Sequence, residues 1–262
     1  MDPEEIVNFM KDPDNQKNKI SGIYNYCDRW CERCAFTSRC MNYAMGEAMG
    51  ARSDESNEAF WNDLENIFEA TFMMIEEEME KMGVDMDEVM KEVEEDKKSY
   101  HRDWDDKHPL FQDAYQTGRL VHNWLQEKAD LLQEKAEESL AINEERLLKL
   151  KDSLEVIQWY NMFVAPKIDR ALSKELWGDD DIDESMEYDK KGSAKVALVA
   201  IERSIGAWGF MLEVWPNEQD FILDVLRRWS VIRDKLIEEV PSAPAFKRPG
   251  FEGGVMFEIE ED

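Results

Sequence analysis

Residues 193–213 read SAKVALVAIERSIGAWGFMLE and decide the fold class. The segment is apolar on most sides of a helix, which is typical of a helix surrounded by other helices. Glu202, Arg203 and Ser204 interrupt it, so it falls short of the roughly 18 uninterrupted apolar residues of a membrane span. We therefore expect a buried, central helix in a helical core.

Helical periodicity continues on both sides of this segment. Apolar residues recur at three- and four-residue steps after the capping residues 53–56 and as far as Gly83. Further helices are predicted at about 85–93, 109–136 (reaching 150 unless a break occurs near Ile142-Asn143), 153–176 with a kink at Pro166, 193–213 and 221–236. Strands do not alternate with these helices. The prediction is an all-α protein, an elongated multi-helix bundle of about six helices.

Three segments differ in composition. Residues 1–52 carry all four cysteines and form a predicted N-terminal cysteine-rich metal- or cluster-binding segment, with short helices near its start and near 41–49. Residues 53–240 form the predicted helical bundle. Residues 241–262 form a tail that contains Pro and Gly, in which only 255–259 has a strand-like pattern.

The charge balance limits the class of partner. The 262 residues include 60 Asp and Glu against 32 Lys and Arg, for a formal charge of −28. Such a surface repels phosphate, so nucleic acid and anionic membrane surfaces are disfavoured. A redox partner or another protein partner with a basic surface remains compatible, and the oligomeric state is left open.

The first residues, MDPEE, lack the basic and apolar regions of a signal peptide. We therefore expect a cytoplasmic protein that does not cross a membrane. Thiols stay reduced in that compartment, so disulfides are the less favoured role for the cysteines.

The four cysteines lie within fourteen residues. Cys27, Cys31, Cys34 and Cys40 have the spacing C-x3-C-x2-C-x5-C. Four thiolates complete the ligand shell of a zinc ion or hold the four irons of a [4Fe–4S] cluster. The spacing predicts a metal or iron–sulfur site.

The uneven spacing favours the iron–sulfur cluster over zinc. Structural zinc sites commonly pair two C-x2-C units, and this loop has one such unit. Arg29, Arg33 and Arg39 are interleaved with the ligands and would offset the negative charge of a thiolate-ligated cluster. Trp30 and Phe36 would shield it from water. The predicted cofactor is a [4Fe–4S] cluster, with Zn²⁺ as the alternative.

Parts of the motif resemble two known loops. The Cys31, Cys34 and Cys40 portion is similar to the cluster loop of endonuclease III-type DNA glycosylases, although the first gap has three residues and not six. The Cys27, Cys31 and Cys34 portion looks like the radical S-adenosylmethionine signature, but the pattern of a βα barrel is missing. Each resemblance covers fewer than fourteen residues, and no activity is carried over from either.

Polar residues in apolar helices supply low-ranking catalytic candidates. His122 lies on the predicted stripe of the 109–136 helix, and Glu155 and Glu202 lie in apolar helices. If buried, they would form either charge-paired core positions or a polar pocket with acid–base capacity. A ferritin-like di-iron site is disfavoured because it needs a Glu-x-x-His on two helices, which none of the three histidines provides.

Three functional hypotheses follow. The first is a cytosolic iron–sulfur protein whose four-cysteine cluster serves electron transfer, redox sensing or structure. The second is a non-catalytic helical interaction protein with a structural zinc site. The third is a metal-dependent enzyme with its site in the helical core around His122, Glu155 and Glu202.

Overall fold

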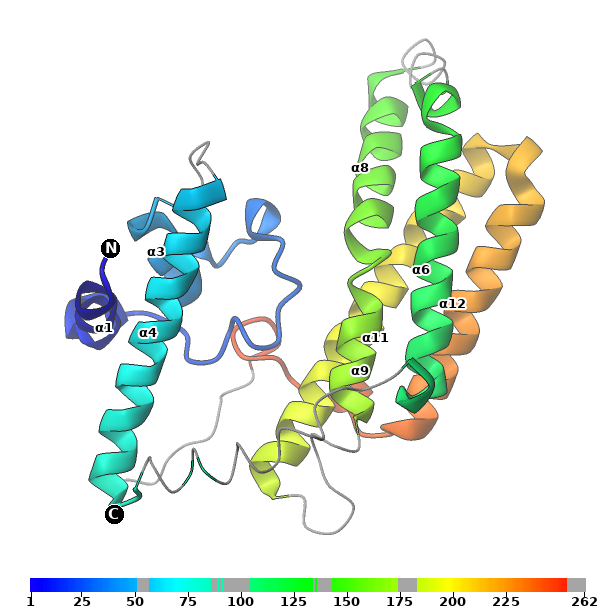
Figure 1. The fold of residues 1–262 in the computed structure, drawn as a ribbon. Helices are drawn as coiled ribbons and strands as arrows, with labels where there is room; N and C mark the ends of the chain where they lie inside the picture. The colour runs from blue at the N-terminus through cyan, green and yellow to red at the C-terminus, as the bar shows by residue number, and fades with distance from the viewer. Residues whose placement is uncertain are drawn as a thin grey trace. The chain divides into compact units, whose positions relative to one another are not determined.

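The computed structural model describes residues 1–50, 57–85, 89, 91, 104–133, 135, 143–173 and 183–253. It divides the chain into two compact units, Met1–Arg102 with Arg248–Asp262, and Asp103–Lys247. The described residues form nine α-helices and no β-strand (Figure 1). The all-α prediction is confirmed, and the helix number is higher than the predicted six.

The first unit contains four of these helices, which are α1 (Pro3–Lys11), α2 (Pro13–Gln16), α3 (Met41–Ala48) and α4 (Asn57–Met82). Asp2 caps α1 in a capping box with Glu5, which satisfies free N–H groups at the helix start. α1 packs along α4, with Ile6, Val7 and Ala70 in the contact (Figure 1). The predicted short N-terminal helix, the helix near 41–49 and the helix that follows residues 53–56 and ends at Gly83 are confirmed.

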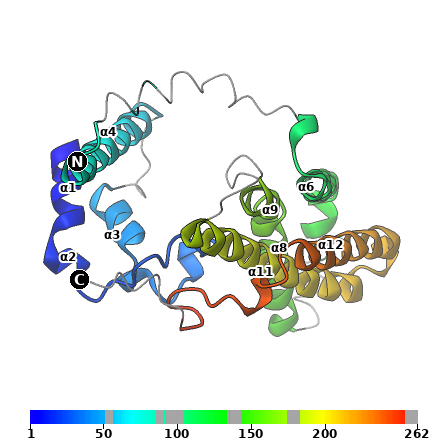
Figure 2. The same cartoon turned by 90° about the horizontal axis from the view of Figure 1, so that it is seen from below.

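The second unit contains α6 (Pro109–Glu127), α8 (Glu144–Tyr160), α9 (Val164–Leu172), α11 (Glu184–Val214) and α12 (Gln219–Glu239). α11 packs against α8, α9 and α12, and α6 packs against α9 and α12 (Figure 2). The expected central position of the 193–213 segment is therefore confirmed.

Aromatic side chains fill the core of this unit at the end of α11. The Trp124 ring lies 5.4 Å from Trp208, 5.1 Å from Trp215 and 5.0 Å from Phe221, measured between ring centroids. Trp124, Trp208 and Trp215 are all buried. Each such ring pair adds about 0.5–1.5 kcal/mol beyond the burial of its area.

Helix boundaries differ from prediction where capping residues intervene. Asn143 caps α8 by accepting a hydrogen bond from the Arg146 N–H at 2.6 Å, so the break expected near Ile142-Asn143 is present. Asp183 caps α11 in the same way, so this helix begins at Glu184 and the predicted start at Ser193 is wrong.

The predicted helix 153–176 is two helices in the structure. α8 ends at Tyr160 and α9 begins at Val164, so the break precedes Pro166. Pro166 occupies the first turn of α9, where its missing N–H would have no helical partner in any case.

Two predicted elements, the helix at 85–93 and the strand at 255–259, fall largely or wholly outside the described residues. In the compact units α4 groups with the cysteine-rich segment, and 248–253 groups with it as well. The boundaries 1–52, 53–240 and 241–262 stay predictions. Among the helices that are described, none has the length and apolarity to cross a membrane.

Candidate metal centre

Two tight turns shape the backbone of the cysteine loop, residues 27–40. Cys31–Arg33 and Thr37–Arg39 are single 3₁₀ turns, closed by hydrogen bonds from the Cys34 N–H to the Cys31 carbonyl and from the Cys40 N–H to the Thr37 carbonyl. Such turns reverse the chain within three residues. As a result, cysteines that follow one another in sequence are arranged around a common centre.

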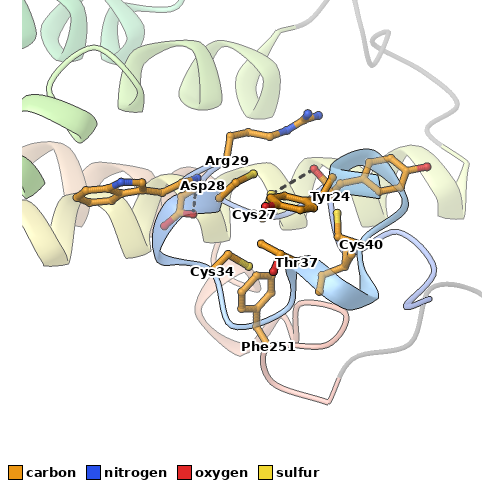
Figure 3. Close-up of a pocket in the computed structure, with 12 residues that line it drawn as sticks. Tyr24, Cys27, Asp28, Arg29, Cys34, Thr37, Cys40 and Phe251 are labelled. Atoms are coloured by element: carbon orange, nitrogen blue, oxygen red, sulfur yellow. Dashed lines mark hydrogen bonds between the residues drawn. The ribbon is translucent and has the colours of Figure 1, made fainter. Parts of the chain in front are cut away.

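All four cysteines line one pocket, as Figure 3 illustrates for three of them. The space between atoms in this pocket is about 320 Å³, which includes open solvent. Cys27, Cys31, Cys34 and Cys40 form no disulfide bonds with one another, and each is partly buried. The loop therefore gathers every thiol of the chain around one space.

The three cysteine sulfurs that can be followed in Figure 3 do not converge on a single point. Figure 3 draws the sulfurs of Cys27, Cys34 and Cys40 at separate positions around the pocket. Within the described ranges, no group of three or more His, Cys, Asp or Glu has the geometry to hold a metal ion. A zinc ion bound by four thiolates at about 2.3 Å would require sulfurs roughly 3.8 Å apart.

Apolar and aromatic side chains enclose the pocket. Ile23 is buried beside it, and Phe251 reaches it from the far end of the chain. The Phe251 ring meets the Phe36 ring edge to face at 5.1 Å. The Arg33 guanidinium lies over the Trp30 ring, with its central carbon 4.1 Å from the ring centroid. These rings limit the access of water to the pocket. Solvent exposure is one of the factors that set the reduction potential of an iron–sulfur cluster.

The segment 248–253 brings Phe251 into place. Arg248 is buried and donates hydrogen bonds to Glu252 from Nε and Nη2, the shorter at 2.7 Å. Gly250 has φ of +76°, and a Cβ there would lie 2.9 Å from both Ile20 and Ile23. Glycine at this position therefore permits both the turn and the close approach to the cysteine loop.

Hydrogen bonds and charge act directly on two of the thiols. The Phe36 N–H donates to the Cys34 sulfur at 3.4 Å, the kind of contact that stabilises a thiolate ligand. Burial raises the pKa of Cys27, and the N–H and guanidinium of Arg29 oppose that effect.

The three interleaved arginines have different surroundings. Arg29 lines the pocket and donates to the Asn42 side chain at 3.2 Å. Arg33 stacks on Trp30, as described above, and Arg39 donates from Nε to the Asn18 carbonyl at 3.2 Å. Arg29 is the arginine that lines the pocket and so is best placed to offset negative charge there.

The core candidates are not buried together. His122 and Glu202 are exposed side chains on α6 and α11. Glu155 on α8 is 38% exposed and lies 3.9 Å from Lys151, a neighbour on the same helix. The burial expected from the sequence is wrong for His122 and Glu202, because the buried faces of α6 and α11 lie on other sides of these helices. The third hypothesis thereby loses the buried polar pocket on which it depended.

A polar pocket between α6 and α12 was missed by the sequence reasoning. The space between atoms in this pocket is about 510 Å³, which includes open solvent, and it is lined by Asp113, Thr117, Arg227, Arg228, Val231, Ile232 and Lys235. The pair Arg227-Arg228 was the available signal. Both arginines bind Asp224, and the Lys235 ammonium lies 3.5 Å from Asp113, so these charges are already offset within the pocket region.

No protein-family model, curated protein or solved structure matches this chain. The residues and geometry of the cysteine loop are therefore the features of the chain that point to a function.

Proposed function

We propose that Cys27, Cys31, Cys34 and Cys40 ligate a [4Fe–4S] cluster, and that the protein uses it for electron transfer, redox sensing or structural support of the first unit. The single observation that carries this proposal is that all four thiols of the chain line one pocket. Soft thiolate ligands in this number suit an iron–sulfur cluster or zinc and suit hard cations poorly.

The uneven spacing of the cysteines supports the cluster over a single ion. A cubane places an iron at each of four corners, so its cysteine ligands lie further apart than the ligands of one zinc ion. Consecutive cysteines with unequal gaps can wrap this larger object. The N–H bond to the Cys34 sulfur and the aromatic lining are further features that suit a cluster.

Ligation by four cysteines leaves no iron with an open position. A cluster held in this way supplies an electron-accepting group and does not bind a substrate as a Lewis acid. The chain's own contribution is to orient the thiolates, exclude water with Phe251 and Phe36, and offset charge with Arg29. Electron transfer and redox sensing both depend on these three contributions.

The charge of the chain indicates the type of partner. With a net charge of −28, electrostatic steering would favour a redox partner with a basic surface and disfavour nucleic acid. A cytoplasmic location belongs to this proposal, since reduced thiols are available there to receive iron.

The proposal is tested with loop variants of the full chain, purified without oxygen. Cys31→Ala and Cys34→Ala should lower both iron and acid-labile sulfide, because each removes one of four ligands. Ser38→Ala is the matched control, since Ser38 is an exposed residue of the same loop that does not line the pocket. Cysteine variants that keep the metal content of the control would contradict the proposal. Loss of zinc in place of iron would support the structural zinc hypothesis.

A further inference from the structure

α4 has two apolar faces. Ile67, Ala70 and Met73 lie on the face that packs toward α1. On the opposite side Phe68 is 57% exposed, Phe72 55%, Ile75 43% and Met82 69%. Large apolar side chains this exposed are unusual when they lie next to one another, and contiguous patches mark interaction sites.

These residues follow the spacing of a coiled-coil seam. Phe68, Phe72, Ile75, Met79 and Met82 are separated by alternating steps of four and three residues, and we call them the outer seam. Alternating steps of this kind place side chains on one stripe along a helix, the a and d positions of a heptad. The outer seam is about 21 Å long, or two heptads. The outer seam therefore has the residue spacing of a surface against which another helix packs.

The charges beside the outer seam decide what kind of helix fits. With Phe72 at an a position, Glu69 and Glu76 occupy the e positions, and both are exposed. Neither forms an ion pair within the described part of the chain. Glu78 occupies a g position and is bound by Lys81 at 2.7 Å. The flanks of the outer seam are therefore acidic.

A second copy of this chain would be a poor partner. In an antiparallel pair of α4 helices the e positions of the two copies would face each other, so Glu69 and Glu76 would lie opposite the same glutamates of the other copy, and like charges there are destabilising. In a parallel pair Glu76 would face Thr71 and Glu78 would face Gly83, so no ion pair would form. A helix with Lys or Arg beside its apolar stripe would instead form ion pairs with Glu69 and Glu76. Complementary charge is what sets partner choice at such positions.

We propose that the outer seam of α4 is a docking surface for a basic amphipathic helix of another protein. The partner helix carries apolar residues at heptad spacing and Lys or Arg on its flanks. This proposal is independent of the cysteine site, because it depends on α4 alone. It assigns a protein-interaction role to the first unit in addition to the proposed cofactor.

The test uses the full chain and two synthetic helical peptides of 21 residues. Both peptides carry Leu and Ile at the a and d positions, and they differ only in Lys or Glu at the e and g positions. Fluorescence anisotropy should show binding of the lysine peptide about ten-fold or more tighter than the glutamate peptide. Added salt should weaken the binding of the lysine peptide.

Variants of the chain locate the surface. Phe72→Ser should abolish binding of the lysine peptide, whereas Leu223→Ser, which changes an exposed leucine of α12, should leave it unchanged. The double variant Glu69→Gln/Glu76→Gln should reduce the preference for lysine over glutamate several-fold. Circular dichroism should show the same helix content in each, since all four side chains are exposed.

Three results would overturn the proposal. The first is no binding of either peptide at high micromolar concentration. The second is equal binding of the two peptides, since charge would then not select the partner. The third is a dimer in sedimentation velocity that Phe72→Ser converts to monomer, because the occupant would then be a second copy of the chain.

Discussion

Replacing Gly118 by alanine should destabilise the second unit, contrary to the usual effect of this change in a helix. Gly118 lies on the buried face of α6, against the turn between α8 and α9. An added Cβ would come well inside 3.0 Å of the Asn161 carbonyl oxygen and 3.1 Å from the Met162 sulfur. The methionine side chain can move aside, but the carbonyl belongs to the backbone.

The magnitude follows from two opposing effects. Forcing an extra group into a packed site costs typically 1–3 kcal/mol, and a backbone obstacle places this site at the upper end. Alanine in a helix interior returns about 0.5–1 kcal/mol relative to glycine. The expected net loss for Gly118→Ala is therefore about 2 kcal/mol in the free energy of unfolding.

Gly206→Ala provides the matched control. Gly206 lies within α11, and a Cβ there meets nothing within 4 Å. The same substitution should stabilise this helix by about 0.5–1 kcal/mol. Urea unfolding followed by tryptophan fluorescence suits the comparison, because the buried tryptophans at 124, 208, 215 and 229 all lie in the second unit. A Gly118→Ala protein as stable as the wild type would refute the packing argument.

Two further predictions concern the partly exposed ion pair Lys128–Glu218 and the shielding of the cysteine pocket. The Lys128 ammonium donates to Glu218 at 2.6 Å and holds the pKa of Glu218 below its usual range, while Trp124 Nε1 donates to the same carboxylate at 3.1 Å. A lowered pKa means that ionised Glu218 stabilises the fold above about pH 4.3 and that this contribution is lost as pH falls through the lowered value. Urea titrations should therefore show Glu218→Gln less stable than wild type at pH 7 and a shrinking difference below about pH 4; a constant difference would contradict the assignment. Phe251→Ala removes a ring that lines the pocket and packs on Phe36, so on exposure to air the visible absorbance of the proposed cluster should decay several-fold faster than in wild type. Equal decay rates would show that the ring does not shield the site.

Local signals in the sequence predicted much of the fold. The recurrence of apolar residues at three- and four-residue steps, together with the flanking sequence signals, was sufficient to locate α4. Gly83 marks its end, because this residue adopts a φ of +69°. The apolar character of 193–213 correctly indicated a central helix. These features depend on neighbours in the chain, which is why a single sequence contains them.

Features that depend on packing were predicted less well. The stripe predicted along α6 included His122, whereas the buried face is centred on Ala114, Val121 and Trp124. Small residues such as Ala114 are buried because α9 and α12 approach closely there, and that approach is not visible in a hydrophobicity pattern. The predicted stripe lies one residue away from the observed buried face, and for this reason His122 was expected in the core.

The cysteine loop was predicted in part. The spacing of the cysteines alone indicated a common site, and the structure places all four around one pocket. The contribution of Phe251 had no sequence signal, because more than two hundred residues separate it from the loop. Which metal the proposed site would prefer depends on distances between sulfurs, which spacing in sequence does not determine.

The most direct test of the account is the iron, acid-labile sulfide and zinc content of the full chain purified without oxygen. The account predicts about four irons and four sulfides per chain, with little zinc. About one zinc per chain without iron or sulfide would contradict the iron–sulfur proposal and make the cysteine loop a structural zinc site. A metal-free protein with four reactive thiols would contradict both metal hypotheses.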